Sequence, residues 1–202
     1  MIFRGLFKGL SFVLPILLPV LVMASECQRD RIELQVLGSG GPELDDGRAS
    51  TSYLIWLDGK ARVLVDLGPG SNVNFGQAGA KLEDINVVML THLHVDHSAD
   101  LPAFVKGAFF TQRQKDLTVL GPGGNDLMPS MAQFVARLFG NEGAFSYLSN
   151  YVDPEKESAF KLKTRSVALD LKEVTYYPIG REMILSAIPV HHGPIAAVAW
   201  RV

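Results

Sequence analysis

The sequence predicts an α/β fold in which strands and helices are layered over one hydrophobic core. Three patterns support this prediction. Apolar and polar residues alternate in the first half of the chain, an almost continuous apolar run follows at residues 85–90, and apolar residues recur every three or four positions after residue 125. With 202 residues, of which 48% are hydrophobic and 20% charged, the composition is that of an ordinary globular domain.

The first 24 residues differ from the rest and are typical of a secretory signal peptide. Arg4 and Lys8 precede an apolar run at residues 10–22, and the segment ends with Ala24, a small residue. An uncleaved membrane anchor is the alternative, although the run is short for a membrane span. We therefore predict a signal peptide at 1–24 and a domain at 25–202, with export to the periplasm or the medium and no stable membrane insertion after cleavage.

Charge and cysteine content bear on the partners. Without residues 1–24 the chain keeps 17 Lys and Arg against 21 Asp and Glu, a formal charge of −4. That average field would repel a long polyanion, so we do not expect a nucleic-acid partner. Cys27 is the only cysteine, which excludes a disulfide within the chain. The sequence leaves a homodimer open.

The elements of the first half begin with strands. Residues 31–37 alternate in the manner of a half-buried strand and lead into a glycine-rich turn at 38–42. Residues 52–57 and 61–66 flank Asp58-Gly59, a dipeptide typical of short hairpin turns. These two segments are therefore expected to pair as antiparallel strands.

A buried strand and two helices follow. The apolar run at 85–90 is typical of a strand that is covered on both faces. Residues 98–110 predict a helix with Ser98 at its N-cap and Pro102 in its first turn. An amphipathic helix is predicted within residues 125–140. Further strands are predicted at residues 117–120, 173–178 and 182–188, and residues 195–202 also have the pattern of a strand.

The histidines are concentrated in two places. All five lie either within residues 91–97 or at His191 and His192, whereas ordinary core or surface histidines would be scattered. Residues 91–97 hold three imidazoles and one carboxylate between the buried strand and the predicted helix. Imidazole and carboxylate are ligands that zinc and related ions prefer, so we predict a metal site.

The spacing within this segment separates two pairs of ligands. Alternation along an extended chain turns His92 and His94 to the same side. Asp96 and His97 are then free to face a second ion. The order His92-x-His94-x-Asp96-His97 resembles the metal-binding motif of the metallo-β-lactamase superfamily.

Other segments are most similar to the branch of that superfamily that contains ribonuclease Z, arylsulfatase-like enzymes and related phosphodiesterases. Together they cover most of residues 32–101. The similar segments are a strand with a glycine loop at 37–42, a polar loop with Arg48 and Ser50 to Ser52, an acidic turn at 65–68, and residues 98–102 after the histidines.

The resemblance implies a fold and a chain boundary. In the family, two mixed sheets pack face to face with helices outside, an αββα sandwich, and this chain would supply the first sheet and only the start of the second. The family pattern continues with a carboxylate that bridges both metals and with a later histidine. No acidic residue follows Glu182 and no histidine follows His192. We therefore expect an amino-terminal fragment of a longer enzyme, incomplete at its C-terminus.

The resemblance also implies roles for individual residues. His92 and His94 would bind the first metal with a third histidine, for which His191 is preferred and His192 is the alternative. Asp96 and His97 would bind the second metal, and Asp96 would also handle the proton of the attacking water. Asp66 would orient a ligand or brace the loop, unless it only ends a strand before a turn.

The implied function is that of a metal-dependent hydrolase with two divalent ions, for which Zn²⁺ is expected. A histidine at position 94, where diiron relatives carry glutamate, favours zinc and hydrolysis. Activated water would attack an ester or phosphodiester bond in a small or medium substrate. The alternatives are a ribonuclease Z-like endonuclease that processes transfer RNA 3′ ends, a lactonase or β-lactamase, and an inactive metal-binding fragment.

Overall fold

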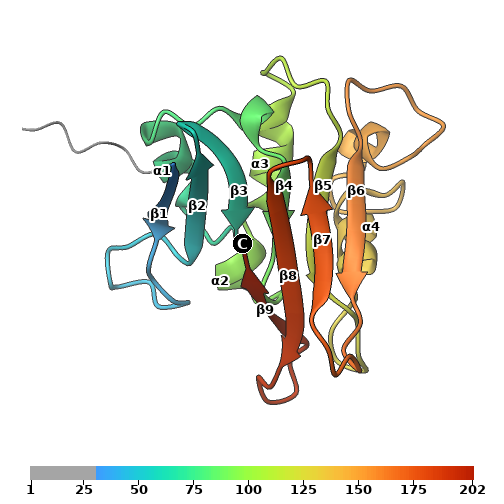
Figure 1. The fold of residues 1–202 in the computed structure, drawn as a ribbon. Helices are drawn as coiled ribbons and strands as arrows, with labels where there is room; N and C mark the ends of the chain where they lie inside the picture. Colours follow the sequence, from blue (N-terminus) through green and yellow to red (C-terminus); the bar gives the residue numbers. More distant parts are fainter. Residues whose placement is uncertain (1–30) are drawn as a thin grey trace, which may run out of the picture.

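Six strands form a mixed sheet in the computed structural model of the protein, which describes residues 31–202. Their order in the sheet is their order in the chain (Figure 1). β1 pairs antiparallel with β2, β2 pairs antiparallel with β3, as the hairpin pattern predicts, and β3 to β6 pair parallel. The bounds are β1 (Ile32–Gly38), β2 (Ser52–Leu57), β3 (Lys60–Val65), β4 (Val87–Met89), β5 (Leu117–Pro122) and β6 (Leu162–Val167).

The predicted signal peptide and Cys27 lie outside the described residues. Export therefore stays a prediction from the sequence. Within residues 31–202, no helix has both the length and the apolar character that a membrane span requires.

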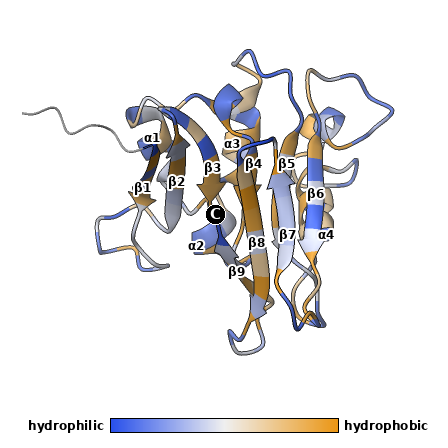
Figure 2. Ribbon diagram, viewed as in Figure 1, coloured by the Kyte–Doolittle hydropathy of each residue, from blue (hydrophilic) through white to orange (hydrophobic). Residues whose placement is uncertain are grey.

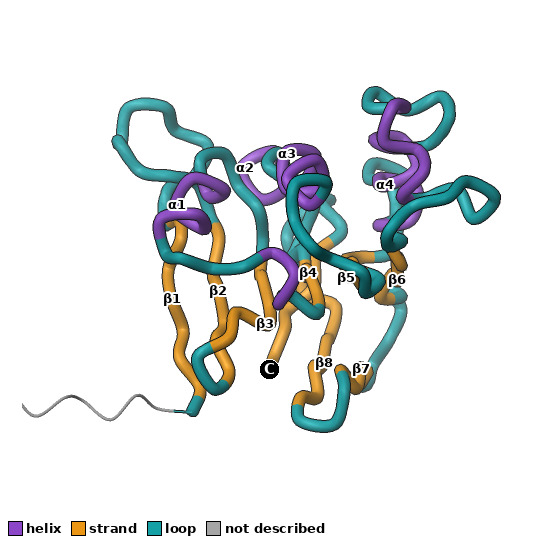
Figure 3. The backbone as a smooth tube through the Cα atoms, turned by 90° about the horizontal axis from the view of Figure 1, so that it is seen from above, coloured by secondary structure: helices purple, strands orange, loops and turns teal. Residues whose placement is uncertain are grey.

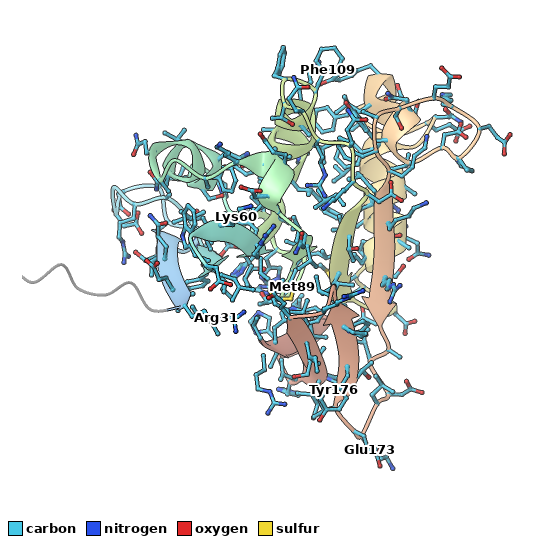
Figure 4. All side chains as sticks on the ribbon, turned by 45° about the horizontal axis from the view of Figure 1, so that its top comes forward. Arg31, Lys60, Met89, Phe109, Glu173 and Tyr176 are labelled. Atoms are coloured by element: carbon cyan, nitrogen blue, oxygen red, sulfur yellow. The ribbon has the colours of Figure 1, made fainter. Side chains whose placement is uncertain are left out.

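A second, smaller sheet packs on one face of the first. It has three antiparallel strands in the order β7, β8, β9. Val63, Met89 and Leu185 are buried between the two sheets, and Figure 4 shows Met89 at this interface. β4 and β8, which contribute to it, are both strongly apolar (Figure 2). The bounds are β7 (Thr175–Ile179), β8 (Met183–Val190) and β9 (Ala197–Arg201).

Helices cover the opposite face of the six-stranded sheet (Figure 3). Leu54 and Leu64 of the sheet pack there with Phe104 of α3 and Phe139 of α4, all almost fully buried. The layers are thus helices, a mixed sheet and a small second sheet, as predicted. The helices are α1 (Ser71–Gln77), α2 (Val95–Ser98), α3 (Leu101–Ala108) and α4 (Met131–Phe139), with the 3₁₀ turns η1 (Leu82–Asp84) and η2 (Ser146–Tyr151).

The second sheet leaves part of the first sheet uncovered. Ile32, Leu34 and Val36 alternate along β1, and their exposed fractions are 64%, 67% and 56%. They lie on the face that carries the second sheet, because Leu34 pairs with Ile55 of β2, which contacts that interface. Among the described residues, the second sheet therefore covers only part of this face of the first sheet.

Both predicted helices differ from the structure at their starts. Residues 98–110 form α3 only from Leu101, because the Ser98 hydroxyl donates to the backbone carbonyl of His94 in the preceding turn. Pro102 does lie in the first turn of α3, as predicted. The helix expected within 125–140 begins at Met131, because the Asn125 side chain accepts backbone N–H groups in a turn.

Sequence analysis missed α1, α2 and β6, and also the 3₁₀ turns η1 and η2. α1 lies in a stretch with only a weak apolar pattern, and no side chain caps its start. β6 is mostly polar and pairs only with β5 among the described strands, so it lies at the edge of the sheet. The strand pattern at residues 195–202 is confirmed, because β9 pairs with β8.

The start of α4 offers a test of the local structure. The Ser130 hydroxyl accepts the Gln133 backbone N–H at 3.3 Å, and the Gln133 side chain accepts the Ser130 N–H at 2.9 Å. We expect Ser130→Ala to lower the free energy of unfolding by about 1 kcal/mol in urea titrations. Ser130→Asp keeps a capping oxygen and should change it far less. Equal losses in both variants would contradict this account of the cap.

Candidate metal centre

The histidine-rich loop begins where β4 ends, at the carboxyl ends of the parallel strands. The Leu90 N–H donates to the Leu120 carbonyl, and the Leu90 carbonyl accepts the indole N–H of Trp200 at 3.1 Å. The Val198 N–H donates to the Thr91 carbonyl, and His92 bridges to Ala197. Residues of β9, distant in sequence, thus hold the loop against the second sheet.

Three histidines converge at this loop. One ring nitrogen from each of His92, His94 and His192 lies within 4.8 Å of the other two. The ring centroids are 4.7 Å apart for His92 and His94, and 4.8 Å apart for His92 and His192. Three imidazoles in this arrangement match the donor set of a zinc site.

The protonation state of His92 suits a metal ligand. Burial, followed by the neighbouring rings of His97, His94 and His192, lowers the pKa of His92 to about 4. The ring is therefore neutral at pH 7 and has a nitrogen lone pair to donate. The donor set thus fits a divalent ion without prior loss of a proton from this ring.

In the structure the third histidine of the group is His192, the alternative in the sequence analysis, and it lies beside His92 and His94. His191, which the sequence analysis preferred, is outside this group of three. Strand parity would place residue 191 on the same side as Leu185 and Ala187, which are buried. β8 ends at Val190, however, so its alternation does not extend to the two histidines, which lie in the turn before Gly193. The position of His192 beside His92 and His94 therefore depends on the turn, and the residue pattern of β8 does not predict it.

Asp66 connects the loop to the end of β3. It is 1% exposed and has a φ of 58°, in the left-handed region. Its carboxylate accepts the Thr91 backbone N–H at 2.7 Å and the Thr91 hydroxyl at 2.8 Å. It also lies 2.8 Å from Nδ1 of His97. The sequence-based expectation that Asp66 braces the loop agrees with these contacts.

These hydrogen bonds determine which nitrogen of each ring carries the proton. An ionised Asp66 can only accept, so Nδ1 of His97 must donate to it, and Nε2 keeps a lone pair. The Thr91 hydroxyl donates its single proton to Asp66, so its oxygen accepts a hydrogen bond from Nδ1 of His92, 3.0 Å away. Both rings therefore present Nε2 as the free donor atom.

Asp96 and His97 form a second polar pair beside the triad. The Asp96 carboxylate lies 3.4 Å from Nε2 of His97, and the ring centroids of His97 and His92 are 4.0 Å apart. Burial would lower the pKa of His97, but the hydrogen bond and charge of Asp66, with the charge of Asp96, outweigh it and raise that pKa. The assignment of this pair to a second ion stays a prediction.

The acidic turn at residues 65–68 packs directly beneath the loop. The Leu67 N–H donates to the His97 carbonyl, and a Cβ on Gly68 would lie 2.2 Å from the Asp96 carbonyl oxygen. Only glycine allows this approach. Ser52 also supports the turn, because its hydroxyl donates to the Asp66 carbonyl at 2.9 Å.

Some residues have roles that sequence analysis did not assign. Thr91 and Ser52 both stand in the motifs, yet only their contacts with Asp66 reveal what they do. Arg48, from the polar loop, pairs with Asp46 at 3.0 Å and not with the histidines. The position of Thr91, a hydroxyl residue directly before the first histidine, was the one feature of the sequence that could have indicated its contact with Asp66.

Comparison with protein families gives a direct match. Residues 45–191 match the model of the metallo-beta-lactamase superfamily. The chain belongs to this superfamily. The match covers most of the chain and includes the loop that carries His92, His94, Asp96 and His97.

Curated relatives within the superfamily are ribonuclease Z proteins. The chain is 31% identical to ribonuclease Z of Clostridium kluyveri over 93 residues, which is 46% of this chain and 30% of that one. It is 38% identical over 95 residues to the enzyme of Mycobacterium sp. (strain KMS), with 46% and 33% covered. Ribonuclease Z of Clostridium tetani is 24% identical over 172 residues, 84% of this chain and 50% of that one. The chain thus matches half or less of the length of these relatives.

Solved structures share the superfamily fold. Human tRNase Z, short form, superposes with a TM-score of 0.63 at 18% identity, covering 83% of this chain and 63% of that one. A metallo-beta-lactamase fold protein from Bacillus subtilis gives 0.54 at 16% identity, with 84% and 56% covered. The family match and the ribonuclease Z relatives agree with the superfamily and the branch that the sequence resembles.

The exclusion of a nucleic-acid partner was wrong. The curated relatives are ribonucleases, and the human structure is a tRNase, so both are named for action on RNA. A formal charge of −4 is a sum over the chain and does not describe the field at one site. Bound cations at a metal centre invert the local charge, which the average does not include.

We expect Asp66→Asn to weaken zinc binding about 10- to 100-fold in competition with a chromophoric chelator. The amide tolerates the left-handed backbone but cannot accept all the donors that the carboxylate holds. Asp58→Asn is the matched control, because Asp58 also has a positive φ, of 50°, in the exposed β2–β3 turn. Unchanged zinc affinity in Asp66→Asn would contradict the bracing role.

The two adjacent histidines allow a second test. We expect His192→Ala to lower zinc affinity by at least about 100-fold, because one of three imidazole ligands is lost. His191→Ala, an identical change one residue earlier, should retain parental affinity. The reverse order of the two variants would show that His191 is the ligand.

Proposed function

We propose that the protein is a metal-dependent phosphodiester hydrolase that acts on RNA. One observation carries this proposal: the three-histidine cluster stands in a chain whose curated relatives are ribonuclease Z proteins, one of them aligned over 84% of this chain. The metal centre by itself is compatible with several leaving groups. The ribonuclease Z relatives favour a phosphodiester bond of RNA as the bond that is cleaved.

His92, His94 and His192 would hold the first metal ion, and Asp96 with His97 would contribute to a second. Zn²⁺ is the proposed metal, because the donors are imidazoles and a carboxylate. A divalent ion bound there supplies a Lewis acid and a concentrated positive charge next to the substrate. The remaining steps belong to side chains of the protein.

The Asp96 carboxylate would accept a proton from the attacking water. It is 9% exposed and lies at the amino end of α2, beside the triad. Asp66 fixes the His97 ring through Nδ1 at 2.8 Å, so Nε2 stays directed toward Asp96. A carboxylate beside the metal ligands can act as a general base when it lies within hydrogen-bond reach of the attacking water.

The substrate class is tested with a panel of matched substrates. We expect the zinc-loaded chain to cleave an RNA, with a transfer RNA that carries a 3′ extension as the first probe, and also a chromogenic phosphodiester. A chromogenic β-lactam and a lactone should be hydrolysed far more slowly. Turnover should stop with a chelator and return with Zn²⁺. Rapid hydrolysis of the β-lactam without cleavage of RNA would overturn the proposal.

Asp96→Asn tests the proposed base. We expect kcat on the chromogenic phosphodiester to fall about 10²- to 10⁴-fold, the range for loss of a general base. Asp45→Asn is the matched control, because Asp45 is exposed in the loop before β2 and should leave kcat unchanged. Parental kcat in Asp96→Asn would exclude the assigned role.

A further inference from the structure

A cavity of about 470 Å³ lies at the opposite end of the parallel strands from the histidines. Arg62 near the start of β3, Asn86 just before β4 and Thr118 near the start of β5 line it from the first sheet. Residues 178–183, the end of β7 and its turn into β8, line it from the second sheet. The metal centre follows the other end of β4, so the cavity is a separate site between the two sheets.

The cavity has more cationic than acidic side chains. Its lining contains two acids, Asp116 and Glu182, and both already have cationic partners. Glu182 pairs with Arg31 at 3.2 Å, and Asp116 lies 3.7 Å from Lys163. The cations that line the cavity are Arg62, Arg113, Lys115 and Arg181.

None of these four cations forms an ion pair with a carboxylate within residues 31–202. Arg62 has one hydrogen bond, to the Asp84 carbonyl, and Lys115 and Arg181 extend from exposed positions at the mouth. Like charges around one cavity repel one another where no carboxylate is paired with them. An arrangement of this kind is stabilised by a bound anion.

Arg113 adds a fixed positive charge to the wall. It is 2% exposed, and its guanidinium donates to the carbonyls of Leu82, Ile85 and Asp116, while its Nε has no partner among the described residues. Burial lowers the pKa of Arg113 to about 10, so the group is still charged at pH 7. The carbonyl oxygens orient this guanidinium, and the carboxylates of Asp116 and Glu83 act on its charge without forming an ion pair with it.

We propose that this cavity binds a phosphate group. Phosphate accepts hydrogen bonds from several donors at once and matches the fork of a guanidinium. Arg62, Lys115 and Arg181 would supply the charged donors. Asn86 and Thr118 would supply neutral ones, and a cavity of this size falls in the range for small-molecule sites. The phosphate has two sources, a free phosphate compound or the backbone of an RNA.

The test measures binding of inorganic phosphate to the zinc-loaded chain by calorimetry. We compare the parent with K115Q/R181Q, in which both mouth cations are neutralised, and with K172Q, an exposed lysine outside the cavity. The double variant should lose one phosphate per chain or bind it at least about tenfold more weakly, because charged hydrogen bonds are lost. K172Q should match the parent, and all three should have the same melting temperature without phosphate.

A single-stranded RNA oligonucleotide distinguishes the two sources. If RNA supplies the phosphate, oligonucleotide affinity falls in K115Q/R181Q and inorganic phosphate competes with the oligonucleotide. If a free compound supplies it, only binding of inorganic phosphate falls. The same phosphate stoichiometry and affinity in the parent and the double variant would overturn the proposal. Because the readout is binding, it is independent of whether the chain hydrolyses RNA.

Discussion

The buried carboxylate of Asp66 is the interaction on which the site depends. It stands at the end of β3 and holds the loop after β4 through the Thr91 N–H at 2.7 Å and the Thr91 hydroxyl at 2.8 Å. A third contact, to Nδ1 of His97, is also 2.8 Å long. A nearly inaccessible carboxylate needs such donors, and the loop needs a fixed acceptor. Each therefore stabilises the other, and the histidine rings take their protonation pattern from this contact.

Much of the fold follows from local pattern, and the exceptions have physical reasons. The β2–β3 hairpin, the buried strand before the histidines and the approximate positions of α3 and α4 are all set by periodicity and turn residues. α1 and β6 were missed because contacts far along the chain stabilise them: α1 packs through Phe75 against Phe104, and β6 through its pairing with β5. Such contacts override weak local preferences.

The candidate site also has a part that the sequence predicts and a part that it does not. His92, His94, Asp96 and His97 lie within one short loop, so their spacing alone brings them together. His192 arrives from the turn between β8 and β9, and whether it or His191 faces the loop depends on backbone dihedral angles that no residue count supplies. The partner prediction failed for a related reason, because net charge averages over the chain. A cationic cavity such as the one lined by Arg62, Arg113, Lys115 and Arg181 does not show in such an average.

We infer that Asp66 and Thr91 set the tautomers of His92 and His97 before any metal binds. Long-range ¹H–¹⁵N correlation spectra of the metal-free chain, labelled at histidine and recorded above the pKa values of both rings, measure this directly. We expect both rings to carry their proton on Nδ1 and to leave Nε2 unprotonated. Protonation of Nε2 in either ring, or rapid averaging between the two tautomers, would contradict it.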